Sequence, residues 1–309
     1  MVSLKYAPIE SESILIAGGT GLIGSRLSEL LRQRGHDIAH LSRRAGKGKV
    51  RTYQWNPQES RIDANALTGR TVIINLSGAN IGGKRWSKAH KQEILDSRTQ
   101  SAIVLREAIS VGGDRVHTYI SPSGVSIYGN HDGSKVFTEE DPPARDFLAR
   151  VCVAWEEHAD KITSPAVRVV KLRTGPVLSG KGGLLEEFAR PIRWFVGAPL
   201  GTGEQYISWI HMTDICNMYA FAVENRNLEG TYNAVAPVPV TNLELTRSIA
   251  HALKRPLFLP PVPKFVLRLI LGEMATLAVE GCKVSSDKII GTGFAFQFDT
   301  LAKAMNDIF

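Results

Sequence analysis

Three glycines spaced three residues apart, Gly18, Gly21 and Gly24, lie between an apolar run and an amphipathic run. Residues 14–17 are typical of a buried strand, and residues 22–31 carry leucine and isoleucine at helical spacing. In such a unit Gly18 permits a sharp turn, Gly21 lets the backbone approach phosphate oxygens, and Gly24 lets the helix pack closely. The first N–H groups of the helix then face an anion. The segment predicts a site for the pyrophosphate of a dinucleotide, and a glycine-rich turn without a ligand is the alternative. The residues expected to bind the cofactor here are Gly18, Thr20, Gly21, Leu22, Ile23 and Gly24.

The predicted second strand, residues 37–42, ends in Ser42, Arg43 and Arg44 without a carboxylate. An acidic residue at this tip would bind the adenosine ribose hydroxyls and disfavour a 2′-phosphate. A guanidinium can instead pair with a phosphate in forked geometry, and Arg43 stands nineteen residues after Gly24. Ser42 and Arg44 can add polar contacts. The pattern favours NADP(H) over NAD(H), with a solvated basic loop as the alternative.

Two further strand ends are expected to face the cofactor. Arg173 follows the predicted strand 167–172 and is counted among the cofactor-contacting residues, although it could also bind an anionic substrate or brace the sheet. The other strand end follows an apolar run typical of a strand buried on both faces, and we expect it to pass the cofactor ribose. Its residues are Leu76, Ser77, Gly78 and Ala79, for which a tight turn is an equally compatible explanation.

Strand-like and helix-like segments alternate through the first half of the chain, which predicts an α/β fold with a Rossmann-type, doubly wound parallel sheet. We expect an N-terminal extension at 1–12, an NADP-binding domain at 13–175 and a smaller α-rich substrate region at 176–309, interleaved with the sheet. Clusters of glycine and proline at 175–176, 180–183 and 197–203 predict loops. The expected strands are 14–17, 37–42, 50–55, 72–76, 116–120, 167–172 and 231–234. The expected helices are 22–33, 87–109, 147–161, 215–223, 241–253, 266–271 and 300–307.

The chain has 309 residues, of which 43% are hydrophobic and 22% charged, as is ordinary for a globular enzyme. Its net charge of +7 comes from scattered lysines and arginines, so no nucleic-acid partner is expected. Cys152, Cys216 and Cys282 form neither a metal-ligand pattern nor a disulfide framework, so we expect no metal and a cytoplasmic protein with reduced thiols. We expect no membrane partner, because no apolar run is long enough to span a bilayer and residues 1–12 lack the apolar core of a signal peptide.

Together these residues resemble the extended and atypical members of the short-chain dehydrogenase/reductase superfamily. The runs 172–178, 197–203 and 208–214, with the C-terminal segment 280–294, are similar to its "epimerase family protein" branch, which carries a C-terminal domain of unknown function. The resemblance implies an NADP(H)-dependent oxidoreductase or a protein like the nucleotide-sugar epimerases, acting on a small molecule that the sequence does not identify. Helices equivalent to 87–109 and 147–161 often form a dimer interface in this superfamily, so a homodimer is an open alternative.

The superfamily usually works through a serine, a tyrosine, and a lysine four residues after the tyrosine. Ser123 is our candidate for the serine, with Ser121 and Ser126 as competitors. The helix that should carry the other two residues holds neither. Placing Glu156 on the superfamily's helical glutamate puts Leu148 and Cys152 at these two positions. A leucine cannot move protons, and a cysteine does not replace an ammonium.

Four alternatives follow from this departure. Tyr128 could supply the proton from another direction, or another group such as His211 or a water could do so. An activated substrate could need no strong acid. Finally, the protein could bind NADP(H) without turnover, as a regulatory or interaction protein. Ser123 and Tyr128 are therefore the candidate catalytic residues, whereas the resemblance implies a mainly structural role for His211 and Asp214.

Overall fold

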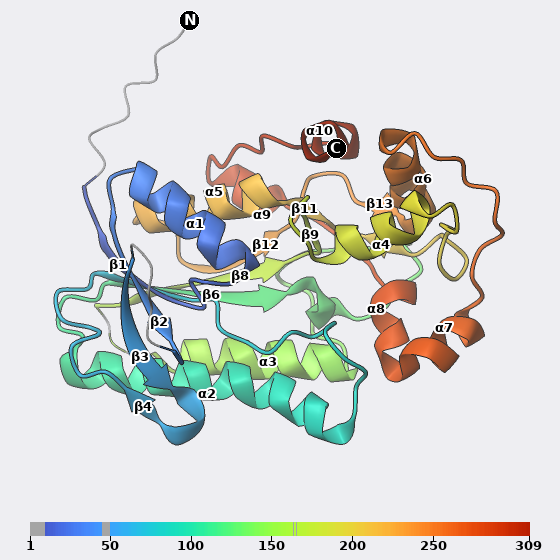
Figure 1. Cartoon of the computed structure of the whole chain (residues 1–309). Coiled ribbons are helices and arrows are strands. Elements are labelled where there is room, and N and C mark those ends of the chain that lie inside the picture. The colour runs from blue at the N-terminus through green and yellow to red at the C-terminus, as the bar shows by residue number, and fades with distance from the viewer. Residues whose placement is uncertain (1–9, 45–49, 163, 165) are drawn as a thin grey trace, which may run out of the picture.

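The computed structural model describes residues 10–44, 50–162, 164 and 166–309. An eight-stranded sheet runs through its centre (Figure 1). Its strands are β1 (Ser13–Ala17), β2 (Asp37–Ser42), β3 (Arg51–Asn56), β4 (Arg61–Ile62), β5 (Val72–Asn75), β6 (Thr118–Gly124), β8 (Arg168–Thr174) and β12 (Gly230–Ala234). They lie in the order β12-β8-β6-β5-β1-β2-β3-β4, and β3 and β4 form the antiparallel pair of an otherwise parallel sheet.

Helices cover both faces of the sheet, which confirms the predicted Rossmann-type, doubly wound α/β fold (Figure 1). One face carries α1 (Leu22–Gln33), α5 (Met212–Glu224) and α9 (Asp287–Gly291). The other face carries α2 (Lys88–Gly112) and α3 (Phe147–Asp160). Side chains of β1 alternate between the two cores: Ile14 and Ile16 pack toward α1 and α5, and Leu15 and Ala17 toward α2 and α3. A central parallel strand must be apolar on both faces, which is why this run could be recognised in the sequence.

The smaller elements gather toward one end of the sheet. Their helices are α4 (Leu184–Arg193), α6 (Asn242–Ala252), α7 (Lys264–Leu271), α8 (Thr276–Val279) and α10 (Leu301–Ile308). Their strands are β7 (Val136–Phe137), β9 (Val177–Leu178), β10 (Tyr206–Ile207), β11 (Ile210–His211), β13 (Val240–Thr241) and β14 (Lys283–Val284). The strands form two-stranded pairs, β9 with β11, β10 with β13 and β7 with β14. Single turns of 3₁₀ helix lie at 57–59, 125–128 and 272–275.

The expected helices agree with observed ones to within about three residues at their ends, but α4, α8 and α9 were not expected. The expected capping box of Thr241 with Glu244 is present at the start of α6. Helix α4 lies between the loops expected at 180–183 and 197–203. Its buried residues Leu185, Ala189 and Ile192 follow helical spacing, but flanking glycines and an internal Pro191 hide this pattern.

His211 and Asp214 hold the C-terminal segment against α5. The Asp214 carboxylate accepts hydrogen bonds from the backbone N–H groups of Gln297 (2.8 Å) and Phe298 (2.9 Å). His211 accepts one from Thr213 N (3.2 Å) at the start of α5, and its ring centre lies 3.9 Å from that of Phe298. Burial raises the pKa of Asp214, and the two N–H donors oppose that rise. These contacts support the structural role that the resemblance implies for the pair.

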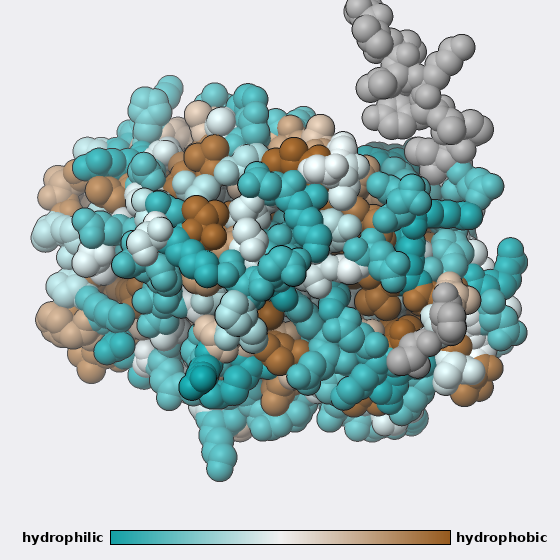
Figure 2. Space-filling view, turned by 180° about the vertical axis from the view of Figure 1, so that it is seen from behind, coloured by the Kyte–Doolittle hydropathy of each residue, from teal (hydrophilic) through white to brown (hydrophobic). Residues whose placement is uncertain are grey.

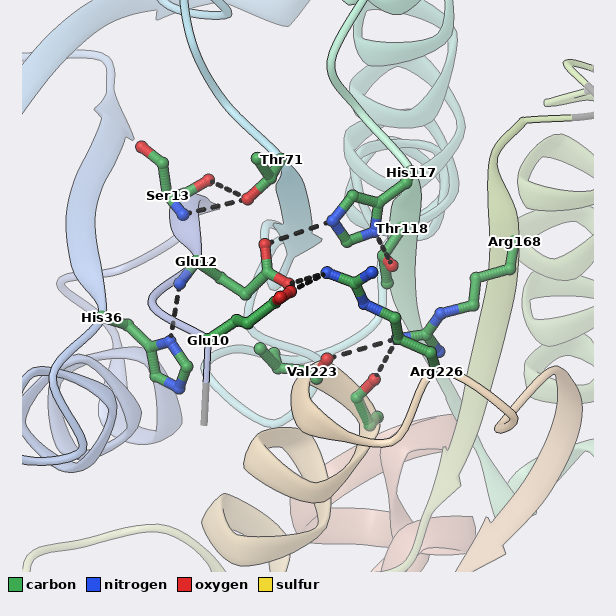
Figure 3. A network of polar contacts seen from close by, with 11 residues as sticks. Glu10, Glu12, Ser13, His36, Thr71, His117, Thr118, Arg168, Val223 and Arg226 are labelled. Atoms are coloured by element: carbon green, nitrogen blue, oxygen red, sulfur yellow. Dashed lines mark hydrogen bonds and ion pairs between the residues drawn. The ribbon is translucent and has the colours of Figure 1, made fainter. Parts of the chain in front are cut away.

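The residues just before β1 tie the N-terminal edge of the sheet together (Figure 3). Glu12 donates its backbone N–H to His36 Nδ1 (3.1 Å). Its carboxylate accepts from His117 Nε2 (3.2 Å) and Arg226 Nη2 (3.3 Å), and Arg226 also reaches the exposed Glu10 (2.8 Å). Residues 10–12 of the predicted extension are therefore part of the folded body.

The surface bears on whether the protein has a dimer partner or a membrane partner. Hydrophobic residues form separate brown groups among teal ones on the face that Figure 2 shows. The exposed positions of α2 and α3 are mainly polar, for example Gln92, Glu107, Arg150 and Glu157. Within the described residues, no helix combines the length and apolar character that crossing a membrane requires.

We expect Glu12→Gln to lower the free energy of unfolding near neutral pH by about 1–3 kcal/mol, because it weakens buried, charge-assisted hydrogen bonds. Burial acts to raise the pKa of Glu12, but hydrogen bonds from Thr71, Arg226 and His117, with the His117 charge, outweigh it and lower the pKa. A carboxylate with a lowered folded-state pKa stabilises the protein above its unfolded pKa and loses that contribution as pH falls through the folded value. The difference between the two proteins, measured by urea unfolding, should therefore shrink in acid.

Glu10→Gln is the matched control, because Glu10 contacts the same arginine from an exposed position. An exposed pair contributes little, so this change should stay within about 0.5 kcal/mol of the parent. Equal effects of the two substitutions, or a Glu12→Gln effect that persists unchanged in acid, would contradict this account.

Candidate functional site

A large cavity opens where the strands of the sheet end at their carboxyl side. Its volume is about 1350 Å³, and residues that follow β1, β5 and β8, together with the end of β6, line it. Open parallel sheets bind ligands at this edge, because the loops that leave neighbouring strands separate there. Side chains from both predicted regions, 13–175 and 176–309, contribute to its wall.

The glycine turn leaves no room for side chains. Gly18 has a φ of +78°, and a Cβ built on it would lie 2.7 Å from the Leu76 carbonyl oxygen. A Cβ on Gly24 would lie 2.3 Å from the Gly18 carbonyl oxygen. Helix α1 thus starts directly against the turn, and no side chain caps its first N–H groups. Uncapped amides at the start of a helix are suited to bind an anion.

The predicted cofactor residues of the turn and of the strand after it divide into two groups. Those that line the cavity are Gly18, Gly21, Leu22, Ile23, Gly24, Leu76 and Gly78. Those that are not part of the lining are Thr20, which is exposed in the turn, Ser77 and Ala79. The side chain of Ser77 donates to Asn75 Oδ1, and the backbone N–H of Ala79 donates to Ser97 Oγ (2.9 Å).

Ser42, Arg43 and Arg44 follow the same edge of the sheet. The parallel register of β1 and β2 pairs Ala17 with Leu41, so Ser42 and Arg43 leave their strand beside the glycine turn. Arg43 and Arg44 are exposed. Their charge is therefore available near the start of α1 without an acidic residue at the strand tip.

His40 packs against the glycine turn, and the sequence alone did not indicate this role. The imidazole is buried in β2, and a Cβ on Gly19 would lie 2.3 Å from its ring. Its Nε2 lies 2.8 Å from Ser28 Oγ of α1. Burial lowers the pKa of His40, which favours the neutral ring. His40 thereby joins turn, strand and helix, and a single histidine in an apolar run carries no signal of that role.

Ser123 lies at the carboxyl end of β6, in the cavity wall. Its Oγ is buried and makes no hydrogen bond of good geometry among the described residues, but it lies near enough to the Cys152 thiol to oppose the rise in the pKa of that thiol. Leu148 and Cys152 of α3, which the resemblance puts at the tyrosine and lysine positions, line the same cavity. Burial, and then the charge of Glu156, raise the pKa of the Cys152 thiol to about 11. The thiol is therefore neutral near pH 7, and this part of the wall offers a hydroxyl without an ammonium beside it.

The hydroxyl of Tyr128 is engaged inside the protein. It donates to Asn233 Oδ1 (2.7 Å) and accepts from Arg173 Nη1 (2.9 Å), and Tyr128 is 3% exposed. Burial raises its pKa to about 12, and the positive charge of Arg173 opposes that rise. Tyr128 is not among the residues that line the cavity.

Arg173 braces the sheet against α3. Its Nε and Nη2 donate to the two carboxylate oxygens of Glu156, at 2.8 and 2.9 Å. Its Nη1 donates to the Tyr128 hydroxyl and to the backbone carbonyl oxygen of Glu139 (3.2 Å). Of the roles expected for Arg173, bracing is the one these contacts support, because its donors are already occupied.

The far wall of the cavity comes from the C-terminal third of the chain. Helix α7, the 3₁₀ turn after it and α8 contribute residues that include Arg268, Glu273 and Thr276. This wall is fastened at both ends: Leu200 bridges to Val262 before it, and β14 pairs with β7 after it. No cluster of three metal-ligating side chains occurs within the described part of the chain.

Comparison with known proteins agrees with this geometry. The chain matches the NAD dependent epimerase/dehydratase family over residues 14–235 and a domain of unknown function, DUF1731, over residues 262–308. An epimerase family protein from Mycobacterium tuberculosis is 37% identical over 293 residues, which make up 94% of this chain and 96% of the relative.

Two solved structures are similar along nearly the whole chain. The human epimerase family protein SDR39U1 (isoform2), crystallised with NADPH, has a TM-score of 0.87 and 30% identity, and the match covers 96% of this chain and 98% of that one. A nucleoside-diphosphate sugar epimerase from Corynebacterium glutamicum has a TM-score of 0.77 and 28% identity, over 96% of this chain and 57% of that one. By its sequence matches, its sheet and its cavity, this chain belongs to the NAD dependent epimerase/dehydratase family, among the epimerase family proteins that carry the DUF1731 domain.

Proposed function

We propose that this protein binds NADP(H) at the glycine turn and transfers hydride between the nicotinamide and a small substrate in the adjoining cavity. The observation that carries the proposal is the uncapped start of α1, which opens into the cavity. Arg43 and Arg44 are exposed at the end of the neighbouring strand β2, outside the cavity lining. The human relative crystallised with NADPH supports the same assignment.

The residues present fit this cofactor. The first amides of α1, at Leu22, Ile23 and Gly24, are placed to bind the pyrophosphate, because Gly18 and Gly24 leave the backbone bare there. Arg43 binds the 2′-phosphate in this proposal, with Ser42 and Arg44 beside it. Leu76 and Gly78 border the ribose in this proposal, whereas Thr20, Ser77 and Ala79 lie outside the cavity lining.

When bound, the nicotinamide of NADPH supplies a hydride. The task of this chain is to orient the reacting carbon and its oxygen. Ser123 Oγ, buried and without a hydrogen bond of good geometry among the described residues, is placed to donate a hydrogen bond to that oxygen. We propose that the proton comes from water or that the substrate is already activated, because Leu148 and Cys152 offer no acid. Tyr128 stays the alternative acid, and its bond to Asn233 is the contact that would have to open.

A second function, NADP(H) binding without turnover, is favoured by one observation. The positions at which the superfamily carries its tyrosine and lysine hold Leu148 and Cys152, with a neutral thiol. In that case a change in the cavity wall on cofactor binding would be recognised by a partner protein.

We expect Arg43→Ala to weaken NADPH binding by about tenfold to a hundredfold, because one charge-assisted contact to the 2′-phosphate is lost. NADH affinity should change little, because NADH lacks that phosphate. Isothermal titration calorimetry with both dinucleotides measures the two effects. The control is Arg61→Ala, which removes an exposed arginine from β4 at the sheet edge. A parent protein that ignores NADPH, or an Arg43→Ala protein that binds it equally well, would refute the assignment.

Gly24→Ala should weaken NADPH and NADH alike, by more than about tenfold, because the new methyl group would collide with the Gly18 carbonyl and displace the start of α1. Gly291→Ala is the control: that glycine also lies in a helix, and a Cβ there meets no atom within 4 Å. Circular dichroism should show that both variants fold. Unchanged affinity in a folded Gly24→Ala protein would place the pyrophosphate elsewhere.

Turnover is tested by NADPH oxidation across a panel of carbonyl compounds. Ser123→Ala should reduce kcat/KM by about tenfold to a hundredfold for any substrate found, because the oxygen loses one hydrogen bond. Tyr128→Phe should have a smaller effect if its hydroxyl is structural. Tight NADPH binding without oxidation of any panel member would favour the binding protein over the enzyme.

A further inference from the structure

Arg98 of α2 is a buried cation without an acidic partner among the described residues. It is 7% exposed and belongs to the cavity wall. Both recorded hydrogen bonds come from Nη1, which donates to the carbonyl oxygens of Ala79 (3.2 Å) and Ile94 (3.0 Å). Its Nε is buried and has no partner in the described part of the chain. Two neutral carbonyl groups therefore provide its hydrogen bonding.

The guanidinium is fixed in place from both sides. Its central carbon lies 4.8 Å from the centre of the Trp155 ring, an arrangement that favours a cation over an aromatic face. On another side a Cβ built on Gly78 would lie 3.1 Å from the same carbon, so a larger residue there would have to displace the guanidinium by a few tenths of an ångström. Gly78 and Trp155 also line the cavity. Arg98 is thus packed between Gly78 and Trp155 in the cavity wall.

The thiol of Cys152, whose charge would act on Arg98, does not balance the guanidinium. Cys152 keeps its proton, since burial raises the pKa of its thiol to about 11. Burial lowers the pKa of Arg98 to about 10, which still leaves the guanidinium charged at neutral pH. A buried charge without a counter-charge is costly, because desolvation is not offset by attraction.

Arg173 provides a comparison within the same chain. It is buried to a similar extent, but Glu156 meets it with both carboxylate oxygens, and the pKa of Arg173 is raised. Arg98 has the same planar, forked side chain and lacks the carboxylate. The difference is explained if the anion that pairs with Arg98 enters with the ligand.

We propose that Arg98 binds a carboxylate of the substrate, so that the substrates of this site are small carbonyl compounds that carry a carboxylate, such as 2-oxo acids. This inference rests on the proposed function, which assigns the cofactor phosphates to the start of α1 and to Arg43. Ser123, in the same cavity, then takes the reacting oxygen while Arg98 fixes the acid group. The guanidinium would act as a binding residue, because a forked contact orients a planar carboxylate.

The test uses two pairs of probes that differ in charge but little in shape: oxamate with oxamide, and phenylglyoxylate with phenylglyoxylamide. Each is titrated into the full-length protein with and without saturating NADP+, and binding is followed by calorimetry and by the rise in thermal unfolding temperature. We expect the parent protein to bind at least one carboxylate more than about tenfold better than its amide.

Arg98→Met should remove this preference and leave NADPH affinity within about twofold of the parent. Arg98→Lys keeps the charge but loses the fork, so it should retain folding and bind the carboxylate about tenfold more weakly. If Arg98→Met fails to fold, the carboxylate-induced rise in unfolding temperature of Arg98→Lys decides the matter. Arg106→Met, on the same helix and half-exposed, is the matched control and should behave as the parent.

Three results would overturn the inference. They are a parent protein that shows no preference for either carboxylate, an Arg98→Lys protein that binds it like the parent, and a loss of NADPH affinity equal to the loss of carboxylate affinity. The last result would assign the guanidinium to a phosphate of the cofactor. Failure of the proposed function is separate: NADPH would then not bind the parent protein, while carboxylate binding would still be measured without cofactor.

Discussion

The structure depends on the contact between the start of α1 and the turn that follows β1. Because Gly18 and Gly24 carry no side chains, the helix begins against the turn and its first amides stay open. The order of the sheet then brings the ends of β1, β2 and β5 together around those amides. The buried imidazole ring of His40 packs against Gly19, so this side of the turn is shielded from solvent. All the ligand-binding roles proposed for this protein lie at this carboxyl edge of the sheet.

The opposite side of the cavity has an unusual distribution of charge. In the superfamily that this chain resembles, a lysine on the helix equivalent to α3 supplies a positive charge that lowers the pKa of the tyrosine and binds the nicotinamide ribose. Here α3 contributes Leu148, Cys152 and Trp155 to the wall, and the positive charge comes from Arg98 of α2. A guanidinium stays protonated and cannot pass a proton on, whereas it binds an anion well. Chemistry at this site would therefore rely on binding and orientation more than on proton transfer by the protein.

Much of the fold could be predicted from local patterns. Apolar runs and the glycine turn located β1, β2 and α1 because their constraints lie within a few residues of sequence. The resemblance, with Glu156 set on the superfamily's helical glutamate, placed Leu148 and Cys152 at the positions of its tyrosine and lysine, and both line the cavity. Helix α4 was not predicted, because flanking glycines and Pro191 obscure its short amphipathic pattern. The contacts of Tyr128 could not be foreseen, because Arg173 and Asn233 reach it from strands that are distant in sequence. Arg98 carries no motif, and its isolation is visible only when the carboxylates around it are located in space.

The C-terminal wall of the cavity is attached to the rest of the protein at two points. Leu200 forms a β-bridge with Val262 before it, and β14 pairs with β7 after it. Between these two points, residues 263–282 contact the ligand space without belonging to the central sheet. Substitutions there can reshape the chamber while the glycine turn remains as it is. Relatives with the same architecture could vary the shape of the chamber along this segment, because its two attachment points lie apart from the glycine turn, Arg98 and Ser123.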